Sequence, residues 1–201
     1  YADRSHDLIE NETCYIQNTL TDKLAKDAFK VLKNNGISSY DEKSGKGVLR
    51  HIVTRVGINT NQYMLVLVTN GEELKNKDKI VNEIISMYPT ITSIIQNVNT
   101  ENTNVILGEK NVILYGDGYI KDALDGYTFK ISPHSFYQVN PLQTVKLYNT
   151  AVEFGGLNKD DVVLDLYCGT GVISILIANE KRKILGVEIV KEAIEAAKKK
   201  V

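Results

Sequence analysis

A glycine-containing loop between a predicted strand and a predicted helix is the feature that most restricts how this chain can fold. The loop, Asp165–Gly171, reads Asp-Leu-Tyr-Cys-Gly-Thr-Gly and follows the apolar run Val162–Leu164. We expect that run to be a short buried strand and residues 172–179 to be a helix, the context in which such a loop binds a ligand. Ile184–Val187 predicts a second strand and residues 191–201 a second helix. This alternation predicts a parallel, doubly wound sheet, of which two strands are present.

The side chains around this loop discriminate between cofactors. A dinucleotide-binding loop has a third glycine beside the pyrophosphate, and Ser174 stands at that position. Asp165 disfavours a pyrophosphate but suits S-adenosylmethionine, which carries an ammonium and a sulfonium. Glu188 ends the second strand, where a carboxylate can accept hydrogen bonds from both ribose hydroxyls. We therefore expect S-adenosylmethionine; the alternatives are an NAD site, or a glycine turn in another α/β protein with Glu188 as a surface acid.

Charge and cysteine content limit the partners and the compartment. The formal net charge is −1 and the pI is near 6.4, so any nucleic-acid contact must come from a local patch. The two cysteines, Cys14 and Cys168, lie far apart in the sequence, and a reducing, cytoplasmic setting fits best. No run approaches the roughly 20 apolar residues that span a bilayer. The chain starts without Met and stops at Val201 inside a predicted helix, which predicts an excised fragment.

Two domains are predicted, with a boundary near residue 130. Residues 1–130 have the periodicities of an α+β domain. The second strand of its hairpin is apolar on both faces and should be central in a sheet. Residues 131–201 form the second domain, which opens with an amphipathic helix from Pro141 to Gly155-Gly156. The elements expected in the first domain are a helix at 19–35, a hairpin of Val48–Val56 and Tyr63–Thr69, a helix at 77–88, a strand at Ile91–Val98 and short strands over 104–132.

A second string narrows the class of protein. Ser132–Asn140 reads Ser-Pro-His-Ser-Phe-Tyr-Gln-Val-Asn, and with Asp165–Gly171 and Gly186–Glu188 it resembles the RNA (uracil-5-)-methyltransferase family, which forms 5-methyluridine in ribosomal and transfer RNA. The resemblance is strong over about 129–198 and looser over 1–128. It implies the α/β class, with an α+β central domain followed by the first half of a Rossmann-like methyltransferase domain. The family's N-terminal β-barrel would lie outside this chain.

The resemblance also implies which residues hold S-adenosylmethionine. Gln138, Tyr167 and Glu188 match family positions that contact this cofactor. Val172 matches another contact position, but without a polar side chain only a backbone or apolar contact carries over. The candidate cofactor-binding residues are Gln138, Asp165, Tyr167, Gly169, Gly171, Val172 and Glu188.

The family's chemistry requires groups that this chain does not supply. Uracil C5 is a poor nucleophile, so the family adds a cysteine thiolate to C6, methylates C5 and removes the C5 proton with a carboxylate base. By the resemblance, nucleophile and base both lie beyond residue 201, so that no catalytic residue is expected here and the fragment should be inactive alone. Cys168 is the possible substitute nucleophile, but a small buried residue in the cofactor loop is its ordinary interpretation.

Cys14 is a candidate iron–sulfur ligand. Some family members hold a [4Fe–4S] cluster with three cysteines upstream and a fourth in the central domain, and Cys14 resembles that fourth position. Four thiolates are normally needed, so a cluster is expected only in the full-length protein and not in this fragment. The alternative for Cys14 is an ordinary buried thiol.

Candidate RNA contacts come from a basic cluster and an aromatic residue. Lys46 and Arg50 belong to the cluster and could attract phosphate, although strand alternation places Arg50 and Arg55 on opposite faces. A solvated hairpin is the alternative. Phe136 could stack on an extruded base, with core packing as its alternative. His134 could touch phosphate, but a structural place on a turn is favoured.

Two other functions compete with RNA methylation. One is a small-molecule methyltransferase whose first domain covers the substrate, which leaves Ser132–Asn140 without explanation. The other is a non-catalytic RNA-binding module that kept the loop for packing. Sequence alone does not specify the oligomeric state, nor which uridine, in ribosomal or transfer RNA, would be modified.

Overall fold

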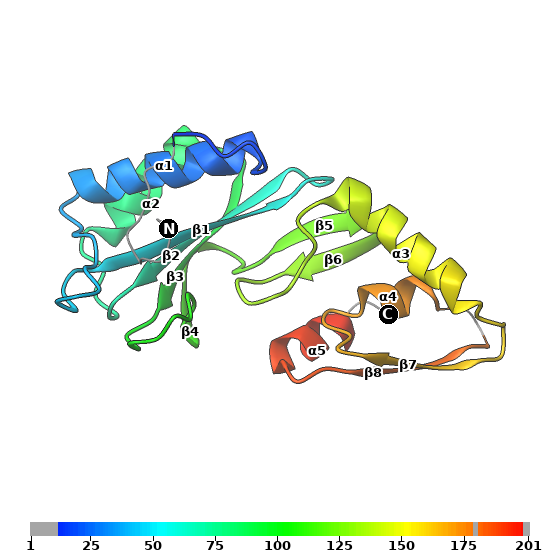
Figure 1. Cartoon of the computed structure of the whole chain (residues 1–201). Coiled ribbons are helices and arrows are strands. Elements are labelled where there is room, and N and C mark those ends of the chain that lie inside the picture. Colours follow the sequence, from blue (N-terminus) through cyan, green and yellow to red (C-terminus); the bar gives the residue numbers. More distant parts are fainter. Residues whose placement is uncertain (1–11, 179–180, 199–201) are drawn as a thin grey trace.

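The computed structural model describes residues 12–178 and 181–198. Five helices and eight strands follow one another along this part of the chain, which forms two groups of elements joined by α3 (Figure 1). The helices are α1 Thr19–Asn34, α2 Lys77–Met87, α3 Pro141–Gly155, α4 Val172–Leu176 and α5 Lys191–Lys198. The strands are β1 Leu49–Gly57, β2 Gln62–Thr69, β3 Ile91–Val98, β4 Lys110–Gly116, β5 Ile120–Leu124, β6 Tyr127–Ile131, β7 Val162–Leu166 and β8 Lys183–Val187.

A four-stranded mixed sheet in the order β1-β2-β3-β4 forms the first group. β1 pairs antiparallel with β2, as the predicted hairpin requires, and β2 pairs parallel with β3. The predicted central place of the second hairpin strand is confirmed, because β2 lies between β1 and β3. The residues of β2 from Tyr63 to Thr69 are all buried, which explains why its sequence is apolar without alternation.

The two faces of this sheet are covered by different elements. Helices α1 and α2 lie on one face (Figure 1), where Leu24, Leu32 and Ile80 pack against Leu65 and Leu67 of β2. The hairpin of β5 and β6 packs on the other face. The core there contains Met64, Val66, Val68, Ile95, Ile120 and Ile131.

The helix predicted from Pro141 is α3, and its two ends carry the expected signals. Pro141 occupies the first turn, and the side chain of Asn140 accepts a hydrogen bond from the amide of Gln143. Gly156 ends the helix in the left-handed conformation, with φ of 54°. The first helix ends in a similar way near Gly36, whose φ is 78°.

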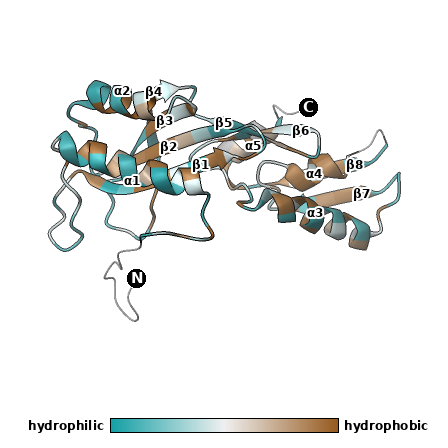
Figure 2. Ribbon diagram, turned by 90° about the horizontal axis from the view of Figure 1, so that it is seen from above, coloured by the Kyte–Doolittle hydropathy of each residue, from teal (hydrophilic) through white to brown (hydrophobic). Residues whose placement is uncertain are grey.

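The predicted parallel pair of strands is confirmed, since β7 pairs parallel with β8. The prediction that Val162–Leu164 is buried is wrong for one face. Val162 is 67% exposed and Leu164 is 57% exposed. They share this face with Leu185, and within the described residues nothing packs over it. Figure 2 shows the hydrophobic character of β7, which was the basis of the prediction.

The first helix of this second group is shorter than predicted. The helix predicted over 172–179 ends at Leu176, because the amide of Ala178 bonds to the carbonyl of Ile175 and tightens the last turn. Residue 179 lies outside the described residues. The last helix reaches Lys198, and residues 199–201 also lie outside. None of the helices within 12–178 and 181–198 has the length and apolar character needed to cross a membrane.

Candidate cofactor site

The loop between β7 and α4 has a backbone conformation that lets a ligand come close to the main chain. Tyr167, Gly169 and Gly171 have positive φ angles of 62°, 55° and 77°. Glycine adopts this conformation without a steric penalty, whereas Tyr167 is strained in it. The side chain of Tyr167 is 87% exposed. Strained residues cluster at binding sites, so this loop is the first candidate.

Glu188 ties the loop to the end of β8. Its Oε2 accepts from the amide of Gly169 at 2.9 Å, and its Oε1 accepts from the amides of Ile189 and Val190 at 2.8 and 2.9 Å. These backbone hydrogen bonds, the one from Val190 most of all, lower the pKa of Glu188 below its usual value. The carboxylate is therefore charged at neutral pH, and Oε2 keeps a lone pair for a ligand hydroxyl.

Asp165 and Cys168 are also fixed by their neighbours. The hydroxyl of Ser174 donates to Asp165 Oδ2 at 2.5 Å, so the residue that replaces the third glycine orients the carboxylate. A Cβ built on Gly186 would lie 2.9 Å from Cys168 Sγ, which shows how closely the thiol packs on β8. Burial, with the charges of Asp165 and Glu188, raises the pKa of the Cys168 thiol. The fraction of Cys168 present as thiolate is therefore smaller than for an ordinary cysteine.

A cavity of about 220 Å³ lies between this loop and the segment Ser132–Asn140. One wall is the loop with the start of α4, and the other is the segment with α3. Five of the predicted cofactor residues line it: Gln138, Asp165, Tyr167, Gly169 and Val172. Gly171 and Glu188 are not among the lining residues, but Glu188 is hydrogen-bonded to the amide of Gly169, which is. Direct contact of any of these seven residues with the cofactor stays a prediction.

Three polar residues of the cavity were not predicted. Tyr148 lines the cavity, and burial raises the pKa of its phenol. Thr144 and Thr170 also line the cavity. Thr170 Oγ1 is buried and has no hydrogen-bond partner within the described residues. The only sequence signal for Thr144 and Tyr148 is their position in α3, after the Ser132–Asn140 string.

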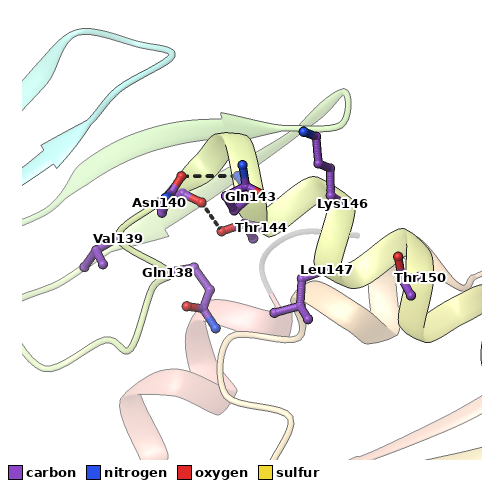
Figure 3. Close-up of a pocket in the computed structure, with 8 residues that line it drawn as sticks. All are labelled: Gln138, Val139, Asn140, Gln143, Thr144, Lys146, Leu147 and Thr150. Atoms are coloured by element: carbon purple, nitrogen blue, oxygen red, sulfur yellow. Dashed lines mark hydrogen bonds between the residues drawn. The ribbon is translucent and has the colours of Figure 1, made fainter. Parts of the chain in front are cut away.

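Gln138 also borders a second hollow of about 410 Å³ along the first turns of α3 (Figure 3). The start of α3 is rigid here, because Asn140 accepts from the Gln143 amide at 3.2 Å and from the Thr144 hydroxyl at 2.6 Å. The side chains of Gln138 and Leu147 extend toward the same side of the helix (Figure 3). The lining residues are Gln138, Val139, Asn140, Gln143, Thr144, Lys146, Leu147 and Thr150.

The three candidate RNA contacts do not gather at one place. Phe136 lines the cofactor cavity and is 73% exposed, so its alternative place in a core is wrong. Arg50 stacks over the ring of Tyr40, and its Nη1 donates to the carbonyls of Asn99 and Glu101. Lys46 is exposed in a turn before β1. Contact of any of them with RNA stays a prediction.

Cys14 cannot hold an iron–sulfur cluster with the residues described. It is a half-buried free thiol, and within 12–178 and 181–198 no three His, Cys, Asp or Glu side chains are grouped as metal ligands. The sequence has one other cysteine, Cys168, which belongs to the cofactor loop. Since four thiolates are normally required, the cluster stays a prediction for the full-length protein.

Comparison with known proteins identifies the family. The tRNA (uracil-5-)-methyltransferase family model matches residues 102–201, which include both strings and the cavity between them. The chain belongs to the RNA (uracil-5-)-methyltransferase family. The resemblance seen in the sequence is thereby confirmed.

Curated relatives of this chain extend the match to the first domain. An RNA methyltransferase of Oceanobacillus iheyensis is 46% identical over 199 residues, and one of Clostridium tetani is 45% identical over 198. Each alignment covers 98% of this chain and 43% of the relative. The chain therefore spans less than half the length of these relatives.

A solved structure confirms the fold class. The crystal structure of Pyrococcus abyssi tRNA (uracil-54, C5)-methyltransferase in complex with S-adenosyl-L-homocysteine matches with a TM-score of 0.81 and 26% identity. The match covers 100% of this chain and 48% of that protein. The chain thus has the mixed α/β fold with a Rossmann-like part.

Proposed function

We propose that this chain is part of an S-adenosylmethionine-dependent enzyme that methylates uracil C5 in RNA and so forms 5-methyluridine. The observation that carries the proposal is the cavity between Ser132–Asn140 and Asp165–Gly171, because the two strings typical of the family face each other across it. The names of the relatives support methylation of RNA, and the name of the Pyrococcus enzyme supports C5 of uracil as the methylated atom.

The groups around the cavity fit the chemistry of S-adenosylmethionine. Asp165 is a carboxylate for the cationic part of the cofactor, and Glu188 can accept a ribose hydroxyl beside the loop. The buried Thr170 hydroxyl, which has no partner within the described residues, is a further polar contact. When bound, the cofactor supplies an electrophilic methyl group. We therefore assign the predicted cofactor residues to this site.

The chemical step needs a nucleophile and a base from the part of the protein outside this chain. A cysteine sulfur forms a bond to uracil C6, the C5 carbon of the resulting enolate takes the methyl group, and a carboxylate removes the C5 proton as the sulfur leaves. Cys168 does not perform the addition, because the raised pKa keeps its thiol protonated. The role of this chain is to bind and orient the methyl donor.

The substrate belongs to the proposal as well. We assign ribosomal or transfer RNA, in the cytoplasm, as the methyl acceptor. Phe136 offers an exposed ring at the cavity on which an extruded uracil can stack. Lys46 and Arg50 add positive charge at the start of β1, which would attract RNA phosphates. Both residues are far in sequence from those that line the cofactor cavity.

Methyl transfer to defined RNAs tests this function. The full-length protein is incubated with methyl-tritiated S-adenosylmethionine and with ribosomal RNA, transfer RNA or a metabolite extract. We expect label in RNA that co-elutes with 5-methyluridine after nucleoside digestion, and no transfer by residues 1–201 alone. Label on another nucleoside, or only on metabolites, contradicts the proposal and favours a small-molecule methyltransferase.

A further inference from the structure

The wall of the cavity formed by Ser132–Asn140 is held in place by the four-stranded sheet. Arg55 of β1 makes the central contact. Its Nη1 donates to the carbonyl of Ser135 and its Nη2 to the carbonyl of Pro133, each at 2.7 Å. Val53, two residues earlier on the strand, packs in the core beneath the sheet, so Arg55 lies on that same face.

Burial of the Arg55 guanidinium is energetically unfavourable in itself. Arg55 is mostly removed from solvent, and burial lowers its pKa. Its Nε is buried and has no hydrogen-bond partner within the described residues. A buried charge is unfavourable unless hydrogen bonds compensate for it. Arginine reaches the two carbonyls from two separate nitrogens in a fixed planar geometry, whereas the donors of a lysine ammonium all lie on one nitrogen.

Other contacts join the same segment to the first domain. His134 Nε2 bonds to the carbonyl of Gly108 at 3.0 Å, and the Tyr137 hydroxyl donates to Asp122 Oδ2 at 3.3 Å. Asp122 is 1% exposed, so this anchor is buried. Residues 133, 134, 135 and 137 are thus attached to the first domain. Phe136, Tyr137 and Gln138 line the cavity, and of these three Tyr137 carries the anchor to Asp122.

We propose that Arg55 is a positioning residue for the cofactor site. By hydrogen-bonding to the carbonyls of Pro133 and Ser135 it fixes the backbone that leads into Phe136. This contact sets the wall that carries Gln138. The first domain then contributes to methyl transfer by shaping the cofactor site, in addition to any contact with RNA. This inference rests on the proposed function.

Substitution of Arg55 in the full-length protein tests the inference. Arg55→Met keeps the length of the side chain and removes both donors, and Arg55→Lys keeps the charge. We expect Arg55→Met to weaken binding of S-adenosyl-L-homocysteine by at least about tenfold, measured by calorimetry, with an intermediate effect for Arg55→Lys. The KM for S-adenosylmethionine should rise more than kcat falls. Hydrogen exchange of the peptide over 132–140 should be faster without ligand.

The matched control is Ile52→Ala, on the same strand but packed against the core on the opposite, helix-covered face. It should lower stability, while cofactor affinity stays within about twofold and exchange of 132–140 is unchanged. Wild-type affinity and exchange in folded Arg55→Met overturn the inference, as does an equal loss of affinity in Ile52→Ala. If Arg55→Met does not fold, unchanged affinity and exchange in Arg55→Lys overturn it.

The two proposals fail in different ways. A wild-type protein that does not bind S-adenosyl-L-homocysteine contradicts the proposed function. The exchange measurement on the free protein still decides whether Arg55 holds the segment.

Discussion

Individual side chains fix the cofactor loop through hydrogen bonds to its backbone and carboxylates. Glu188 is held by three amides and Asp165 by the hydroxyl of Ser174. Both acids were predicted from the sequence, because their charge and position in the loop are local features. The role of Ser174 was missed: the sequence shows only that a glycine is absent, while the bond to Asp165 depends on the turn between strand and helix.

The reactivity of Cys168 tests whether its thiol is protonated at neutral pH and is not the nucleophile. Because its pKa is raised, the thiolate fraction at neutral pH is smaller than for a free cysteine. The alkylation rate should therefore still be rising with pH at about pH 8.5, where that of a free cysteine begins to level off. Reaction with iodoacetamide across pH, followed by mass spectrometry of the Cys168 peptide in a Cys14→Ser background, measures this. Cys168→Ala in the full-length protein should keep methyl transfer within about threefold.

Rapid alkylation of Cys168 at pH 7 would contradict the assigned pKa. Loss of methyl transfer in a folded Cys168→Ala protein would restore this residue as a candidate nucleophile. Ser174→Ala provides the comparison, because it removes the bond to Asp165 and keeps the cysteine.

At the scale of the element, helix ends and hairpins follow local sequence rules. Asn18 caps α1 by accepting from the amides of Leu20 and Thr21 at 3.0 and 3.2 Å. Asn18→Ala should therefore lower the free energy of unfolding by about 1 kcal/mol, while Asn18→Ser should retain most of it. Urea denaturation followed by circular dichroism measures the difference. Equal loss in the Ser and Ala variants would show that the cap does not stabilise α1.

The elements were predictable and most of their pairings were not. The apolar run of β2 indicates a central strand, and Pro141 and Gly156 mark the ends of α3. The packing of the β5 and β6 hairpin beneath the sheet depends on contacts such as Asn59 with Asp122, whose residues are 63 positions apart. Contacts at that separation leave no periodic signal in the sequence. The exposed face of β7 was mispredicted because apolar composition does not specify a packing partner.

In the whole molecule, the cofactor cavity lies where the two groups of elements meet. The segment Ser132–Asn140 follows the β5 and β6 hairpin, is anchored by Arg55, and faces the loop after β7. The family strings pointed to both walls in the sequence, but the attachment of Ser132–Asn140 to β1 required the structure. The predicted boundary near residue 130 stays a prediction.

The central claim is that this site serves methylation of uracil at C5. Methylation at C5 replaces the hydrogen on that carbon, so RNA labelled with tritium at uridine C5 reports the reaction directly. With the full-length protein and S-adenosylmethionine, we predict that tritium is released to water in equal amount to the methyl groups transferred. Methyl transfer without tritium release would contradict the account, because the methyl group would then be on another atom.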